Sequence, residues 1–206
     1  MKLYTTRRAP NPRRVAWIMA EKGITDIEVV EIDLLKGEHR TPEYLAKVGA
    51  PNSPALELEN GTVITESVAI GRYLESRYPE PNLYGRDAEE IAVIEMWTRR
   101  AELTVSMPMM GFVRHTHPAM AALAGEQSPE YAQVSKGFGE SGMKAFDRRL
   151  AASPFLAGER LTIADIVGFS GIDFGRLIQY RPPEKFTNVA RWIDDLRARP
   201  ASTAGL

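Results

Sequence analysis

Hydrophobic and polar positions follow two different periods along this chain. In the first third, short segments rich in β-branched and aromatic residues alternate with segments whose apolar positions recur every three or four residues. The first kind predicts strands at 2–6, 27–33, 55–58 and 62–65, and the second predicts helices at 13–22, 42–48 and 68–78. After residue 86 only the helical period remains, with long helices expected at 87–113 and 128–152 and shorter ones beginning at 162 and near 189.

This order of elements predicts an α+β protein with two domains. A helix joins the first two strands, so they should be parallel with a right-handed crossover. The last two strands are joined by a tight turn and should be antiparallel. A βαβαββα domain of the thioredoxin-like kind is therefore expected at residues 1–78. A proline-rich linker at 79–86 and an all-α domain at 87–206 should follow.

Local signals predict where several elements begin, turn or end. Asn11 suits an N-cap and Pro12 the first helical position. Asn60-Gly61 suits a two-residue type I′ turn, in which both residues have positive φ. Pro108 should kink or break the long helix, because it lacks a backbone N–H.

Two further signals concern the helical region. Thr162-Ile163-Ala164-Asp165 forms a capping box at the start of an apolar helix. Three glycines, Gly137, Gly139 and Gly142, lie inside the predicted helix 128–152 and weaken its local propensity by about 1 kcal/mol each. Packing must therefore stabilise this helix.

Composition narrows the range of partners and chemistry. The 206 residues carry a formal net charge of −1 with no basic stripe, so nucleic acid is not expected as a partner. No run of about 18 apolar residues predicts a membrane span, and the first residues enter strand-like sequence without a signal peptide. The cysteine count is zero, which favours a cytoplasmic protein and excludes a cysteine nucleophile and thiolate-ligated metal. No metal site is expected at His115 and His117 either.

One stretch, residues 53–67, has the features of a small-molecule binding site. Ser53-Pro54 opens the predicted hairpin, and Glu66-Ser67 begins the helix that follows it. Free N–H groups and the dipole at a helix N-terminus favour an anion there. An acid and a hydroxyl at that position predict a site that holds a small molecule by its backbone and its charged end.

Four motifs, taken together and in order, resemble those of cytosolic glutathione S-transferases, including bacterial theta/nu-like members. They are Ser53-Pro54-Ala55-Leu56, then Ile64-Thr65-Glu66-Ser67-Val68-Ala69-Ile70, then Phe155-Leu156-Ala157-Gly158 with Thr162–Ile166, and finally Asn188-Val189 through Trp192 to Ala198-Arg199-Pro200. The loop at Lys36-Gly37-Glu38-His39 also resembles theta-like members. The resemblance covers essentially the whole chain.

The resemblance implies glutathione as cosubstrate and assigns residues to its parts. Ser67 and Glu66 would hold the γ-glutamyl carboxylate and ammonium. Ser53, presented by a cis Pro54, would pair its backbone with the cysteinyl residue. His39 would reach the glycyl carboxylate, with Asn52 assisting. Each of these residues also has an ordinary structural alternative, such as a helix cap or a solvated loop.

The sequence departs from the resemblance at the position that activates sulfur. Serine-type members place a hydroxyl where this chain has Ala9. Lowering a thiol pKa from about 8.5 to about 6.5 requires about 2.7 kcal/mol, and one hydrogen bond to a charged group supplies about 1.5–3 kcal/mol. Asn11, at a helix N-terminus, is the first candidate replacement, followed by Thr6 and Thr5. A cation from Arg7 or Arg8 is a further alternative.

The resemblance further implies conjugation of glutathione to small hydrophobic electrophiles by a homodimer. The electrophile pocket would be lined by Met107, Met110, Phe112 and Arg114, although core packing explains each of these side chains as well. Ala9 leaves two alternatives open, namely a non-catalytic ligand-binding or interaction protein with this fold, and glutathione-dependent thioether or disulfide chemistry.

Overall fold

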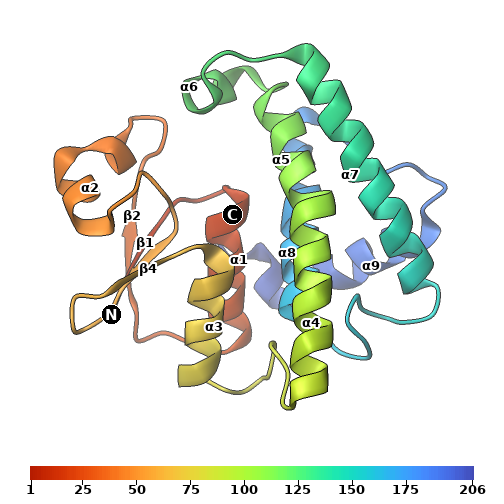
Figure 1. Cartoon of the computed structure of the whole chain (residues 1–206), viewed down its shortest axis with the longest axis horizontal. Coiled ribbons are helices and arrows are strands. Elements are labelled where there is room, and N and C mark those ends of the chain that lie inside the picture. Colours follow the sequence, from red (N-terminus) through yellow and green to blue (C-terminus); the bar gives the residue numbers. More distant parts are fainter. The chain divides into compact units, whose positions relative to one another are not determined.

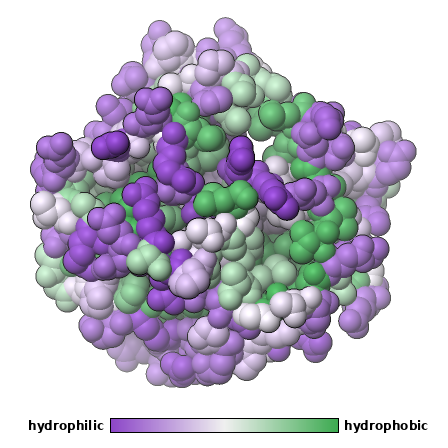
Figure 2. Space-filling model, turned by 180° about the vertical axis from the view of Figure 1, so that it is seen from behind, coloured by the Kyte–Doolittle hydropathy of each residue, from purple (hydrophilic) through white to green (hydrophobic).

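The computed structural model describes residues 1–206. The chain divides into two compact units, one made of Met1–Pro81 together with Thr203–Leu206, and the other of Asn82–Ser202. No helix in either unit combines the length and apolarity that crossing a membrane requires. Polar side chains cover most of the face seen in Figure 2, with apolar ones gathered in patches between them.

The first unit contains a mixed four-stranded sheet in the order β2-β1-β3-β4. Strand β1 pairs parallel with β2 and antiparallel with β3, and β3 pairs antiparallel with β4. The elements are β1 (Lys2–Thr5), α1 (Pro10–Glu21), β2 (Glu28–Glu31), a 3₁₀ turn (Glu38–Arg40), α2 (Pro42–Val48), β3 (Ala55–Glu57), β4 (Val63–Thr65) and α3 (Ser67–Arg77). The predicted βαβαββα order and the predicted strand directions are confirmed.

Alternation along the central strands sends side chains to both faces of this sheet. Tyr4 and Ala55 are buried against Tyr44 and Val48 of α2. Leu3, on the opposite face, is also buried. Helices α1 and α3 pack against each other on that second face, so α2 covers one side of the sheet and α1 with α3 the other (Figure 1).

Two local predictions in this unit were wrong. Helix α1 begins at Pro10 with Ala9 as its N-cap, so Asn11 and Pro12 both lie inside the first turn. Pro10 fits the first helical position as well as Pro12 would, since neither needs an N–H there. The hairpin is not a type I′ turn, because Gly61 has φ 82° but Asn60 does not have positive φ. Instead Leu58 C=O accepts from the Gly61 N–H, which makes a longer turn ending in a left-handed glycine.

The second unit is entirely helical. Its helices are α4 (Ala88–Arg100), a π-helical segment (Ala101–Ser106), α5 (Met107–Arg114), α6 (Ala121–Ala124), α7 (Pro129–Leu150), α8 (Ile163–Phe174) and α9 (Thr187–Arg197), with 3₁₀ turns at Pro118–Met120, Gly175–Ile178 and Pro200–Thr203. Helix α8 is the centre, since every residue from Ile163 to Asp173 is buried.

The predicted capping box at the start of α8 is confirmed. Asp165 is completely buried, and its carboxylate also accepts from the Leu156 N–H and from Trp192 Nε1, both at 2.9 Å. Burial raises the pKa of this carboxyl, while these donors act in the opposite direction. One side chain thus ties the helix start to the loop before it and to α9.

Of the two outcomes predicted for Pro108, a break does not occur; the helix is instead distorted directly before the proline. The Thr104 carbonyl four residues earlier cannot receive a helical bond from proline. The chain widens into a π turn over Ala101–Ser106, where the Met107 N–H bonds Glu102 C=O, and then continues as α5. Two glycines give this segment room. A Cβ on Gly142 of α7 would lie 2.3 Å from the Thr104 oxygen, and one on Gly171 of α8 would lie 2.4 Å from Ser106 Cα.

These contacts predict opposite effects for different glycines of α7 and α8. Gly142→Ala and Gly171→Ala force backbone to move and should each lower the free energy of unfolding by about 1–3 kcal/mol or more. Gly137→Ala is the matched control, because nothing lies within 4 Å of its added Cβ. That change should stabilise the exposed helix position by roughly 0.5–1 kcal/mol. Urea denaturation of the three variants measures the difference, and equal effects at 137 and 142 would contradict the close-packing explanation.

Candidate functional site

The start of α3 has the geometry of an anion site. Glu66 is its N-cap and adopts φ 66° and ψ 117°, a conformation that is uncommon outside glycine. Ser67, the first helical residue, is buried at 3% exposure. The side chain of Glu66 makes no capping hydrogen bond at this terminus, and neither Thr65 nor Ser67 is the N-cap residue. The helix dipole at this end therefore favours a bound negative charge.

An arginine missed in the sequence lies beside this terminus. Arg14 of α1 is 1% exposed, and its Nη1 donates to Ser67 Oγ at 3.2 Å. A buried guanidinium places positive charge next to the first turn of α3 and joins it to α1. The sequence signal for this residue was the pair Arg13-Arg14 directly before the apolar stretch of the helix. In the structure both arginine side chains are buried.

The segment before β3 is held from α2. The Ser53–Pro54 peptide bond is cis, as the resemblance implies. The Tyr44 hydroxyl of α2 donates to the Asn52 carbonyl at 2.5 Å. Burial, with Tyr4 nearby, raises the pKa of Tyr44 to about 12, so this donor keeps its proton at neutral pH. The Asn52 side chain is exposed, whereas Ser53 Oγ is buried with no hydrogen-bond partner.

His39 lies in the 3₁₀ turn before α2 and is 5% exposed. This excludes the alternative of a solvated loop histidine. Burial lowers the pKa of His39 below its ordinary value, and the charge of Arg40 lowers it further. Its ring is therefore neutral at pH 7, and its Nδ1 is buried without a hydrogen-bond partner.

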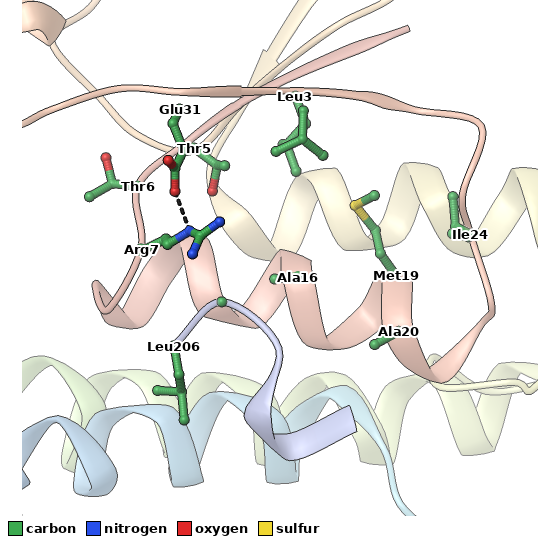
Figure 3. Close-up of a pocket in the computed structure, with 12 residues that line it drawn as sticks. Leu3, Thr5, Thr6, Arg7, Ala16, Met19, Ala20, Ile24, Glu31 and Leu206 are labelled. Carbon is green, nitrogen blue, oxygen red and sulfur yellow. Dashed lines mark ion pairs between the residues drawn. The ribbon is translucent and has the colours of Figure 1, made fainter. Parts of the chain in front are cut away.

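The three candidate sulfur donors differ in what their side chains already bind. Thr6 Oγ1 donates its proton to the Ile32 carbonyl at 2.5 Å. Thr5 is 9% exposed and, with Leu3, lines a cavity of about 600 Å³ beside α1 (Figure 3). Asn11 lies in the first turn of α1, and its Oδ1 is buried with no partner.

Buried polar atoms without partners concentrate in the predicted site. Five such side-chain atoms occur in the chain, and three belong to Asn11, His39 and Ser53. The other two are Nε atoms of Arg13 and Arg14, whose side chains have other interactions. Buried polar groups are nearly always hydrogen-bonded, and an exception often marks a place where another molecule completes the bonding. The first unit thus has unused hydrogen-bonding capacity on three residues of the predicted site.

The predicted electrophile-binding residues on α5 do not share one face. Met107, Met110 and Arg114 recur at a spacing of three and four residues and lie on one side of the helix. Phe112 points to the other side and is buried at 8% exposure, with its ring 5.6 Å from that of Tyr180. Phe112 therefore belongs to the core of the helical unit. The predicted grouping of all four side chains therefore stays a prediction, with Phe112 on a different side of α5 from the other three.

Protein-family models match segments in both units of the chain. Residues 3–82 match the N-terminal domain of glutathione S-transferases, and residues 106–200 match their C-terminal domain. Glutathione S-transferase 2 of Saccharomyces cerevisiae is 33% identical over 203 residues, which are 98% of this chain and 87% of that protein. The chain belongs to the glutathione S-transferase family.

Solved structures of glutathione S-transferases agree over nearly the full length. A glutathione S-transferase domain-containing protein from Marinobacter aquaeolei VT8 is 36% identical with a TM-score of 0.93, covering 98% of this chain and all of the other. Gtt2 from Saccharomyces cerevisiae is 33% identical with a TM-score of 0.91, covering 98% of both chains. The family and the fold predicted from the sequence are confirmed, and the comparisons favour a glutathione-using transferase over the non-catalytic alternative.

Proposed function

We propose that the first unit binds glutathione and lowers the pKa of its thiol for attack on small hydrophobic electrophiles. The observation that carries this proposal is the set of buried, unpartnered polar atoms on Asn11, His39 and Ser53. In this arrangement residues 1–78 form the glutathione-binding domain, 79–86 the linker and 87–206 the helical domain. Met107, Met110 and Arg114 of α5 would contact the electrophile.

The two charged ends of glutathione fit different parts of this unit. The γ-glutamyl carboxylate would bind at the start of α3, where Ser67, the helix dipole and the Arg14 charge act together. Glu66 would pair with the γ-glutamyl ammonium. The backbone of Ser53 would pair with the cysteinyl residue, and Asn52 and His39 would face the glycyl end.

Asn11 is the donor that best replaces the missing hydroxyl at Ala9. Rotating its amide by 180° puts Nδ2–H in the place of Oδ1, and no existing bond opposes that rotation because Oδ1 has no partner. The first turn of α1 adds its own positive potential, which favours a thiolate. Thr6 would have to give up its bond to Ile32, and Thr5 follows it in rank.

Ultraviolet absorbance of thiolate against pH, measured on the glutathione complex, tests this function. We expect the bound thiol to titrate near pH 6.5, about two units below free thiol. Asn11→Ala should raise that value by about one to two units, since it removes one hydrogen bond to a charged group. Ser128→Ala, which removes the N-cap of α7 in the other unit, is the control and should lower fold stability while leaving this value unchanged. If the wild-type complex titrates like free glutathione and no electrophile reacts, the transferase proposal fails; an unchanged Asn11→Ala variant would reject only this donor.

The lowered pKa of His39 predicts how glutathione affinity depends on pH. A glycyl carboxylate beside His39 would favour its protonated form, so binding should raise its pKa. By linkage, affinity then increases as pH falls through the histidine range, by about 3–10-fold in total. S-methylglutathione, which has no titratable thiol, isolates this effect in calorimetry between pH 7.5 and 5.5.

The matched variant is His39→Gln, which keeps a neutral donor. Its affinity for S-methylglutathione should resemble that of the neutral wild type at pH 7.5 and should not rise at lower pH. A wild-type affinity that is flat or falls toward pH 5.5 would remove His39 from the glycyl carboxylate.

We also propose that the protein is a homodimer that uses α7 at its interface. Tyr131, Val134 and Phe138 recur along one side of α7 and are 53%, 55% and 65% exposed. A stripe of large apolar side chains on a helix typically marks a protein interface. Sedimentation velocity should give a dimer for the wild type and a monomer for Phe138→Glu. Leu177→Glu, at another exposed apolar position, should remain dimeric; a monomeric wild type would contradict the proposal.

A cytoplasmic location is the remaining part of the proposal. The absence of cysteine and the charge balance of the chain support it. Cell fractionation with antibodies against the protein tests it, and recovery outside the cytoplasmic fraction would reject it.

A further inference from the structure

The segment Thr203–Leu206 packs with the first unit, far from it in sequence. Gly205 C=O accepts a hydrogen bond from the Arg8 N–H at 2.8 Å. Gly205 and Leu206 line the same cavity as Thr5, Thr6 and Arg7, beside α1 (Figure 3). This segment therefore contacts the loop between β1 and α1, which carries the candidate sulfur donors.

Gly205 is suited to this contact by its conformation and by its lack of a side chain. Its φ of 77° lies in the left-handed region that L side chains rarely adopt. A Cβ there would lie 3.1 Å from Ala16 Cβ and 3.3 Å from Arg13 Cα, tighter than ordinary contacts. The backbone of residue 205 thus lies directly against the first turns of α1.

The loop that Gly205 contacts has few other constraints. Arg8 adopts φ 63°, which is uncommon for a residue with a side chain. Ala9 is the N-cap of α1 and provides no side-chain cap. The ion pair of Arg7 with Glu31 joins two largely exposed side chains and contributes little. The hydrogen bonds that hold this loop are those of Thr6 to Ile32, of the Arg8 N–H to the Gly205 carbonyl, and of the Arg13 N–H to the Ala9 carbonyl within α1. The Gly205 carbonyl is the one that comes from a distant segment of the chain.

We propose that Gly205 is a positioning residue for thiolate formation, holding the Arg8 N–H so that the first turn of α1 presents Asn11 to the glutathione sulfur. This inference rests on the proposed function of the first unit. Gly205 touches neither glutathione nor the electrophile. It acts by fixing the path of Arg8 and Ala9, from which the position of Asn11 follows.

Gly205→Val is the decisive variant, because a β-branched residue opposes both the positive φ and the contact with Ala16. We expect turnover at pH 6.5 and saturating glutathione to fall about tenfold, as loss of one well-placed hydrogen bond predicts. The bound thiol should titrate about one unit higher. The KM for glutathione should change less than threefold, since residues 53–67 are not touched. Amide hydrogen exchange at Arg8 should become faster in the same variant.

Gly23→Val is the matched control. Gly23 ends α1 at φ 63° with nothing within 4 Å of an added Cβ, so the variant strains the other end of the same helix. It should lower stability without changing the thiol titration or Arg8 exchange. Gly205→Ala, a milder change, should shift both measurements in the direction of Gly205→Val and keeps the test usable if valine prevents folding.

The outcomes separate this inference from the proposed function. A normal thiol titration and unchanged Arg8 exchange in both Gly205 variants would overturn the positioning role while leaving the transferase intact. Equal shifts in Gly23→Val and Gly205→Val would also overturn it, since general destabilisation would explain them. A wild-type complex that titrates like free glutathione would overturn the proposed function and this inference together.

Discussion

The hydrogen bond from Arg14 to Ser67 connects the beginnings of two helices, and the site of the first unit depends on that connection. Burying a guanidinium is unfavourable unless its donors are satisfied, so Arg14 constrains whatever lies at the start of α3. Ser67 is fixed as an acceptor, and positive charge is held beside a helix terminus that already favours anions. The same bond joins α1, whose first turn carries Asn11, to the first turn of α3.

The first unit also leaves hydrogen-bonding groups unused. A fold without a ligand would gain stability by pairing the buried atoms of Asn11, His39 and Ser53. Their arrangement is better explained by a bound molecule that supplies the missing donors and acceptors. Residues outside the candidate site hold its loops in place. The Tyr44 hydroxyl binds the Asn52 carbonyl, and the Gly205 carbonyl binds the Arg8 N–H. Neither the Tyr44 hydroxyl nor the Gly205 carbonyl changes its protonation near neutral pH, so both hydrogen bonds persist there.

The sequence predicted the sheet, its strand directions and the capping box because these depend on local signals. Alternation, helical spacing and the Thr162–Asp165 pair are each read within a few residues. The failures involve contacts between distant segments or competition between local signals. Gly142 and Gly171 accommodate the π turn only because three helices meet there, and nothing near Pro108 in sequence reveals them. Asn11 and Pro12 looked like a helix start, but Pro10 was equally suitable and came first. Arg14 and Gly205 act on residues more than 50 positions away, so no motif pointed to them.

The replacement of a hydroxyl donor by Ala9 can be weighed against what the loop still provides. Holding a thiolate near pH 6.5 requires about 2.7 kcal/mol relative to free thiol. A helix N-terminus supplies about 0.3–1 kcal/mol at a surface and up to about 2 kcal/mol when partly buried. An amide N–H on a charged acceptor supplies about 1.5–3 kcal/mol. In the proposed arrangement, the first turn of α1 and Asn11 together would therefore suffice without a hydroxyl, provided that both point at the same sulfur. The orientation of the Asn11 amide toward the sulfur is therefore what limits the stabilisation, because an amide on a loosely held turn would lose most of its contribution. A serine contributes its hydroxyl from a short side chain, whereas Asn11 depends on how firmly the backbone before it is held.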